Sequence, residues 1–118
     1  YNNRNVLIVG SGPRAREFTR LILQHDEWGL RIIGYVDDEP REEDANILGS
    51  QIIGTIGDIP RLVQENIIDE VIVAIPRRFL DRVEDVILNR NPHATDALLE
   101  IADKYREDHI GGQGTQVD

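Results

Sequence analysis

Residues 5–15, NVLIVGSGPRA, place a glycine-rich loop directly after a short apolar run. Residues 5–9 suit a strand that is buried on both faces of a sheet. Helical periodicity follows the loop, with Ala15, Phe18, Leu21 and Ile22 on one apolar stripe. The sequence therefore predicts a strand, a glycine turn and a helix in succession, which is how a parallel α/β sheet begins.

The loop matches the pattern G-x-G-x-x-G/A, which is typical of dinucleotide-binding folds. Gly10 permits the tight turn, Gly12 lets a pyrophosphate approach the backbone, and the small Ala15 lets the helix pack on the strand. Free backbone N–H groups and the helix dipole favour an anion at this place. We therefore predict ligand contacts from the whole loop, which comprises Gly10, Ser11, Gly12, Pro13, Arg14 and Ala15.

Acidic residues follow the second predicted strand, residues 30–36 (LRIIGYV). Asp37 and Asp38 stand there, and Asp37 comes 25 residues after Gly12 (37 − 12). A carboxylate at this place takes the ribose hydroxyls and repels a ribose 2′-phosphate, so NAD or a UDP-sugar is favoured over NADP. A CoA-like nucleotide stays open as a ligand. The alternative is that the glycines only make a tight turn and that the aspartates cap a loop.

Three arginines are candidates for binding the phosphates of a ligand. Arg14 lies in the glycine loop, and Arg77 and Arg78 follow the strand predicted over residues 71–75. Since the carboxyl ends of parallel strands share one sheet edge, all three could face one crevice. For each arginine alone, a solvated surface position is the alternative.

The rest of the chain continues to alternate strands with helices, and residues 40–50 read as a loop. The further predicted elements are a short strand over 51–55, a short helix capped by Asp58, a strand over 71–75, a helix over 79–89 and a helix over 94–106. We expect a Rossmann-like parallel sheet of about four strands with flanking helices, truncated before a fifth strand, plus an extra C-terminal helix. The expected organisation is a nucleotide-binding domain over 1–90, an appended helix over 91–110 and a flexible tail over 111–118.

Composition excludes several classes of function. The 118 residues include 13 basic and 22 acidic ones, and a net charge of −9 repels nucleic acid. No apolar run approaches the ~20 residues that span a bilayer. Cysteine is absent and Lys104 is the only lysine, which excludes thiolate chemistry, a P-loop and a pyridoxal phosphate site. We expect no catalytic residue, no metal ligand, no nucleic-acid partner and no membrane contact from these residues.

The N-terminal two thirds resemble a known family on the segments VLIVGSGPRAREFTRLIL, IIGYVDDEP and ILGSQIIGTIGDIPRLVQENIIDEVIVAIP. Residues 4–80 resemble the cytoplasmic Rossmann-like, CoA-binding-like domain of bacterial polyprenyl-phosphate sugar-1-phosphate transferases. They are also similar to the equivalent domain of membrane-bound nucleotide-sugar dehydratases. The resemblance implies a cytoplasmic domain of a parent enzyme at the inner membrane, whose catalytic residues lie outside this chain.

A second resemblance concerns residues 83–106, VEDVILNRNPHATDALLEIADKYR. They are similar to a helical segment of cobalamin-dependent methionine synthase, which suggests a fusion. The signature D-x-H-x-x-G that ligates cobalamin is missing, so cobalamin binding is not implied.

Several functions remain open on the sequence alone. The leading one is a nucleotide-binding or regulatory domain of a sugar transferase of polysaccharide biosynthesis. The alternatives are an assembly module that has lost its ligand and a chimeric α/β domain. A helix with Leu98, Ile101 and Tyr105 on one side must bury that side, either against its own domain or against a second copy. We favour the second copy and therefore expect a homo-oligomer.

Overall fold

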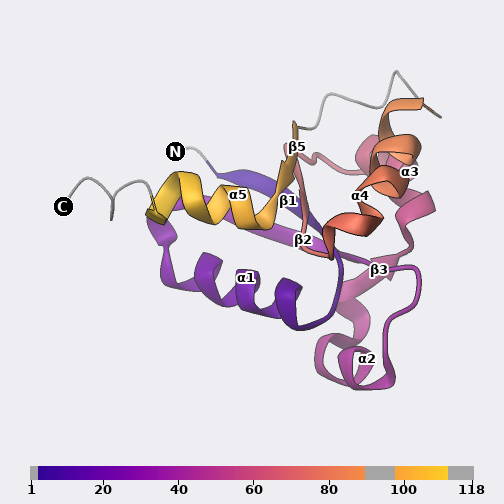
Figure 1. Cartoon of the computed structure of the whole chain (residues 1–118), viewed down its shortest axis with the longest axis horizontal. Coiled ribbons are helices and arrows are strands. Elements are labelled where there is room, and N and C mark those ends of the chain that lie inside the picture. The colour runs from indigo at the N-terminus through magenta and orange to yellow at the C-terminus, as the bar shows by residue number, and fades with distance from the viewer. Residues whose placement is uncertain (1–2, 90–97, 112–118) are drawn as a thin grey trace.

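The computed structural model describes residues 3–89 and 98–111 and shows a parallel sheet between two layers of helices (Figure 1). The strand order is β3-β2-β1-β4-β5. The strands are β1 (Arg4–Val9), β2 (Leu30–Val36), β3 (Ile52–Gly54), β4 (Glu70–Val73) and β5 (Leu98–Ile101). The helices are α1 (Pro13–Gln24), α2 (Glu42–Leu48), α3 (Ile59–Glu65), α4 (Leu80–Glu84) and α5 (Ala102–Arg106). Turns of π-helix over Asp85–Asn89 and Glu107–Gly111 extend α4 and α5.

The central strand β1 explains the layering. Its residues Val6 to Val9 are fully buried, as expected of a strand covered on both faces. Leu7 and Val9 pack against α3 and α4, whereas Val6 and Ile8 pack against α1 and α5. Burying each such side chain stabilises the fold by roughly 1.5–3 kcal/mol.

The chain reverses its direction across the sheet between β1 and β4. From β1 it proceeds to β2 and β3 on one side, and then crosses to β4 and β5 on the other. Val9 pairs with both Val36 and Val73, so the carboxyl ends of β2, β1 and β4 lie level. In open parallel sheets, ligands bind at this reversal, outside the carboxyl ends of the strands.

The predicted fold class is confirmed, but the sheet has five strands instead of about four. Residues 98–101 form β5, which pairs in parallel with β4 from Glu70 opposite Leu98 to Val73 opposite Ile101. The helix predicted over 94–106 is therefore wrong for these residues, as is the helical resemblance there. The apolar spacing fits a helix, but the free edge of β4 offers backbone hydrogen bonds that a strand can complete.

The proposed division of the chain at residue 90 and the tail after Gly111 fall outside the described residues and stay predictions. Within them, the expected self-association surface does not form as one stripe. Ile101 belongs to β5, and Tyr105 of α5 is buried beneath Phe18 and Trp28 of its own chain.

The loop predicted over 40–50 is also wrong, because residues 42–48 form α2. Its first turn holds Glu42, Glu43 and Asp44, which complement the positive end of the helix dipole. Asp44 and Leu48, four residues apart, are its buried side chains. The helix could not be recognised from an apolar stripe, because one of its two buried side chains is the charged Asp44.

Candidate nucleotide site

Gly10 makes the turn from β1 toward α1, and only glycine fits there. Its φ angle is +114°, which is strained for any residue with a side chain. Its N–H donates to the carbonyl of Val36 at 2.7 Å. A Cβ atom would lie 2.7 Å from the carbonyl oxygen of Ala74 and 2.8 Å from the Cγ2 of Ile75. Gly10 is therefore required by the fold itself.

Gly12 is not required by the fold. It caps the twelve-residue α1 with an ordinary extended backbone, φ −83°. A Cβ atom at Gly12 would meet nothing closer than the carboxylate of Asp44 at 3.9 Å and the guanidinium of Arg41 at 4.0 Å. Pro13 occupies the first turn, where no acidic residue stands, and Ala15 is fully buried against the sheet. The bare backbone at Gly12 leaves room for a phosphate at the positive end of α1.

Asp37 lies beside the glycine loop, as its position after β2 predicts. Its Oδ2 accepts hydrogen bonds from the backbone N–H and the hydroxyl of Ser11, at 3.0 and 2.6 Å. Its Oδ1 accepts from the N–H of Glu39 at 3.0 Å. A carboxylate offers about four lone-pair sites, so Asp37 can accept one further hydrogen bond, for example from a ribose hydroxyl.

Asp38 does not reach the glycine loop. Its carboxylate accepts from the N–H of Ile56 at 3.0 Å and from the Nε of Arg82 at 2.7 Å. For Asp38 the capping alternative is thus the better description. Asp37 and Asp38 nevertheless line one cleft of about 400 Å³, whose apolar wall includes Ile75 and Phe79. We call it the Asp37 cleft.

A charged cluster beside Gly12 was not predicted from the sequence. Asp44 of α2 has a side chain only 3% exposed, and it binds two arginines. Arg41 donates to it at 3.0 and 3.2 Å, and Arg16 donates both to Asp44 and to the carbonyl of Ser11. Two guanidinium groups around one carboxylate leave a net positive charge next to the glycine loop. Arg16 and Arg41 lie 25 residues apart in the sequence (41 − 16), and no local sequence pattern connects them to each other or to Asp44.

Electrostatics keep Asp44 charged. Hydrogen bonds from Arg41 and Arg16 outweigh the desolvation by burial and lower the pKa of Asp44 to about 2. The same contact raises the pKa of Arg41. The cluster therefore stays an ion pair network at every physiological pH, and it holds the guanidinium of Arg41 near Gly12.

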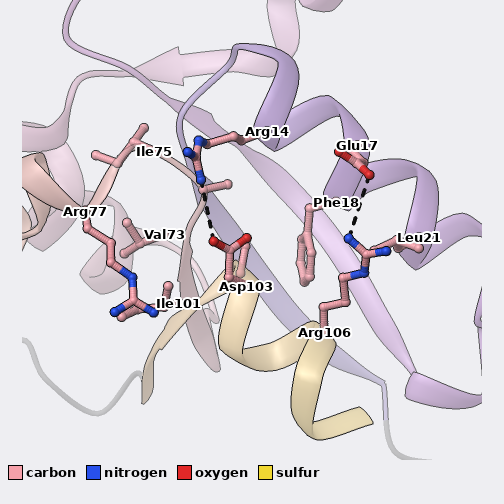
Figure 2. A pocket seen from close by; sticks show the side chains of 12 residues that line it. Arg14, Glu17, Phe18, Leu21, Val73, Ile75, Arg77, Ile101, Asp103 and Arg106 are labelled. Atoms are coloured by element: carbon pink, nitrogen blue, oxygen red, sulfur yellow. Dashed lines mark ion pairs between the residues drawn. The ribbon is translucent and has the colours of Figure 1, made fainter. Parts of the chain in front are cut away.

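The three predicted arginines do not share one crevice. Arg14 and Arg77 line a second cleft of about 310 Å³ between α1 and α5 (Figure 2), which we call the α1–α5 cleft. Arg78 is absent from its lining, and its guanidinium lies 4.7 Å from the centre of the Phe79 ring. Arg106, which sequence analysis did not select, lines this cleft instead.

Two properties of the described residues bear on the class of site. No helix in residues 3–89 or 98–111 is both long and apolar enough to cross a membrane. No group of three or more histidine or acidic side chains in the same ranges is arranged to hold a metal ion.

Fold and loop together define a Rossmann-type nucleotide-binding domain. The family model of the CoA-binding domain matches residues 1–93. The chain belongs to this family. The match ends before β5 and α5, so the far wall of the α1–α5 cleft lies outside it.

Solved structures with the same fold belong to RSP, a Rex-family repressor. RSP itself aligns with a TM-score of 0.60 and 15% identity, over 98% of this chain and 62% of that chain. Its complex with beta-NADH gives 0.58 and 16%, over 98% and 60%. Its complex with beta-NAD+ and operator DNA gives 0.57 and 15%, over 97% and 62%. At this identity the likeness shows the fold alone, and the present chain spans about three fifths of the length of those structures.

Proposed function

We propose that this chain is a non-catalytic, regulatory nucleotide-binding domain whose ligand carries a diphosphate and a ribose with free hydroxyls. The observation that carries the proposal is Gly12, where neither backbone conformation nor packing calls for glycine. The open backbone there meets the positive end of α1 and the guanidinium of Arg41. A diphosphate satisfies both.

The acidic side of the site selects among such ligands. Asp37 has one hydrogen-bond position left for a ribose hydroxyl, and Asp38 and Glu39 line the same cleft. These carboxylates repel a phosphate on the ribose. We therefore expect NAD(H) or a UDP-sugar to bind more tightly than NADP(H) or CoA, whose riboses are phosphorylated. A structure of RSP contains beta-NADH, which agrees with this expectation, but the expectation rests on the acidic residues of the present chain.

Titration calorimetry of the purified chain with NADH, NADPH, UDP-glucose and CoA tests the proposal. NADH or UDP-glucose should bind, and Gly12→Ala should weaken that binding at least about tenfold because its methyl group occupies the phosphate position. Gly57→Ala is the matched control, since a Cβ there meets only Thr55 Oγ1 at an ordinary 3.7 Å. If none of the four ligands binds, the chain is the assembly module considered above.

For the parent protein we propose a sugar-phosphate transferase of polysaccharide synthesis, with this domain on its cytoplasmic face. The support is the resemblance of residues 4–80 in the loop, the GYVDD segment and the IDEVIVAIP strand. The competing parent is a DNA-binding regulator, because one similar structure contains operator DNA. The net charge of −9 argues against direct nucleic-acid contact by this chain. A homo-oligomer stays part of the proposal and is tested by sedimentation.

A further inference from the structure

The α1–α5 cleft is lined by both charged and apolar side chains, which come from helices and strands far apart in the sequence. Phe18 and Leu21 of α1 and Ile101 of β5 form an apolar wall, and Arg14 and Arg106 stand on opposite elements at the rim (Figure 2). The volume of about 310 Å³ suits part of a small ligand.

The rim concentrates positive charge in a protein that is otherwise acidic. Arg14, Arg77 and Arg106 line the cleft, against the two carboxylates Glu17 and Asp103. The whole chain has a net charge of −9, so a local excess of cations is unusual for it. Within the described part of the chain, Arg77 has no ion-pair partner. An anion is therefore the favoured occupant of this cleft.

The carboxylates already on the rim are weakly held. Arg14 lies 3.5 Å from Asp103, and Arg106 lies 3.9 Å from Glu17. All four side chains are between 56% and 66% exposed. Exposed ion pairs at such distances contribute little to stability, so a carboxylate on a ligand can replace them at small cost.

The α1–α5 cleft shares one lining residue with the glycine loop and another with the Asp37 cleft. Arg14 belongs both to the glycine loop and to the rim, and Ile75 lines both clefts. A Cβ atom added at Gly10 would lie 2.8 Å from the Cγ2 of Ile75, so Ile75 packs closely against the loop. A diphosphate on the loop would thus direct one end of its ligand to Asp37 and the other end into the α1–α5 cleft.

We propose that the α1–α5 cleft recognises a carboxylate at the distal end of the ligand, the end remote from the ribose held by Asp37. Arg14 and Arg106 release Asp103 and Glu17 and bind the carboxylate of the ligand instead. The inference rests on the proposed nucleotide-binding function. It identifies the ligand class as a nucleoside diphosphate with an acidic distal group, either a sugar acid or a carboxylated pyridine.

Two pairs of probes isolate the distal carboxylate. UDP-glucuronate differs from UDP-glucose by a carboxylate in place of a hydroxymethyl group, and nicotinic acid adenine dinucleotide differs from NAD by a carboxylate in place of an amide. Titration calorimetry should show the acidic member of a pair binding about tenfold more tightly than the neutral one. The pair that responds distinguishes a sugar acid from a pyridine acid.

Arg106→Gln should abolish this preference, so that the acidic and the neutral member of the pair bind with equal affinity. The control is Arg20→Gln, an exposed arginine of α1 that does not line the cleft, and it should keep the preference. Equal binding of acidic and neutral members in the unaltered protein overturns the inference and leaves the proposed function standing. If no member of either pair binds, both proposals fail together.

Discussion

Ser11 and Asp37 lock the glycine loop to the end of β2, because one carboxylate oxygen of Asp37 accepts from both the backbone N–H and the hydroxyl of Ser11. The side chain of Ser11 is fully buried, so its hydroxyl has no water to replace the aspartate. The acid that was expected to serve a ligand therefore also shapes the loop that would hold the phosphates. Loss of the hydroxyl tests this double role.

Ser11→Ala should lower the free energy of unfolding by about 1.5–3 kcal/mol, the usual value for a hydrogen bond to a charged group. Urea denaturation at neutral pH measures it. Ser50→Ala, at an exposed position, is the matched control and should change stability by no more than about 0.5 kcal/mol. Equal effects at the two serines would show that the hydrogen bond from Ser11 to Asp37 does not stabilise the fold.

The two glycines of the loop should respond oppositely to alanine. Gly10→Ala forces a side chain into a φ of +114° and a contact of 2.7 Å with the Ala74 carbonyl, so it should cost at least about 2 kcal/mol. Gly12→Ala should leave the thermal melting temperature within a few degrees of that of the unaltered chain, because its Cβ has space. A Gly12→Ala variant as unstable as Gly10→Ala would show that Gly12 serves the fold and not a ligand.

The comparison of sequence with structure shows which physical signals are local. β1 and β4 were predictable because strands buried on both faces are continuous apolar runs, and the glycine turn is a local pattern. β5 was missed because the residues around 98–106 have a spacing that also fits a helix, and only the edge of β4 decides between the two. The strand β5 thus required knowledge of the assembled sheet, whereas α5 lies within the range predicted as helix.

The site also combines residues that local patterns reveal with residues that only distant contacts explain. The loop and Asp37 were found from spacing along the chain. Asp44 was not, because its burial follows from Arg16, 28 residues away, and from Arg41 across the first turn of α2. No single-sequence pattern distinguishes a buried aspartate with two partners from a solvated one.

Asp44→Asn should destabilise the protein in a pH-dependent way. The pKa of Asp44 falls from 3.8 to about 2 on folding, so its charged form stabilises the native state above pH 4. The variant should lose about 2 kcal/mol at pH 7. That difference should shrink as the pH falls from 4 toward 2, where the aspartate is protonated in both states. Urea denaturation at pH 7, 4 and 3 measures it, and a pH-independent difference would contradict the ion-pair account.

Glu70 should show the opposite dependence. Its side chain is 1% exposed, Arg4 binds one oxygen at 2.5 Å, and the other oxygen has no hydrogen-bond partner among the described residues. Burial raises the pKa of Glu70 above 4.5, so protonation favours the native state. Relative to Glu70→Gln, the unaltered protein should gain stability as the pH falls through the raised pKa, with the gain complete only below the unfolded-state value of 4.5. Thermal melts between pH 7.5 and about 3.5 measure it, and parallel curves would contradict it.

Tyr105, which was expected on a surface for self-association, lies in the core of its own chain. Its side chain is 4% exposed, with its ring centre 5.8 Å from that of Phe18 and 5.5 Å from that of Trp28. Both contacts are edge-to-face, and the ring of His109 stacks on it at 4.0 Å.

Tyr105 thus joins α5 to α1 and closes the core on that side of the sheet. Tyr105→Ala should lower the free energy of unfolding by about 3–5 kcal/mol, as for other buried aromatic residues. Lys104→Ala, next to it, removes only an exposed ion pair with Asp108 at 3.3 Å and should cost less than about 1 kcal/mol. Circular dichroism melts measure stability, and sedimentation of the same samples reports the oligomeric state. A Tyr105→Ala variant that stays as stable as the unaltered chain but becomes monomeric would contradict this account. It would show that Tyr105 lies at an interface between copies, because an intermolecular contact can be lost without loss of the fold.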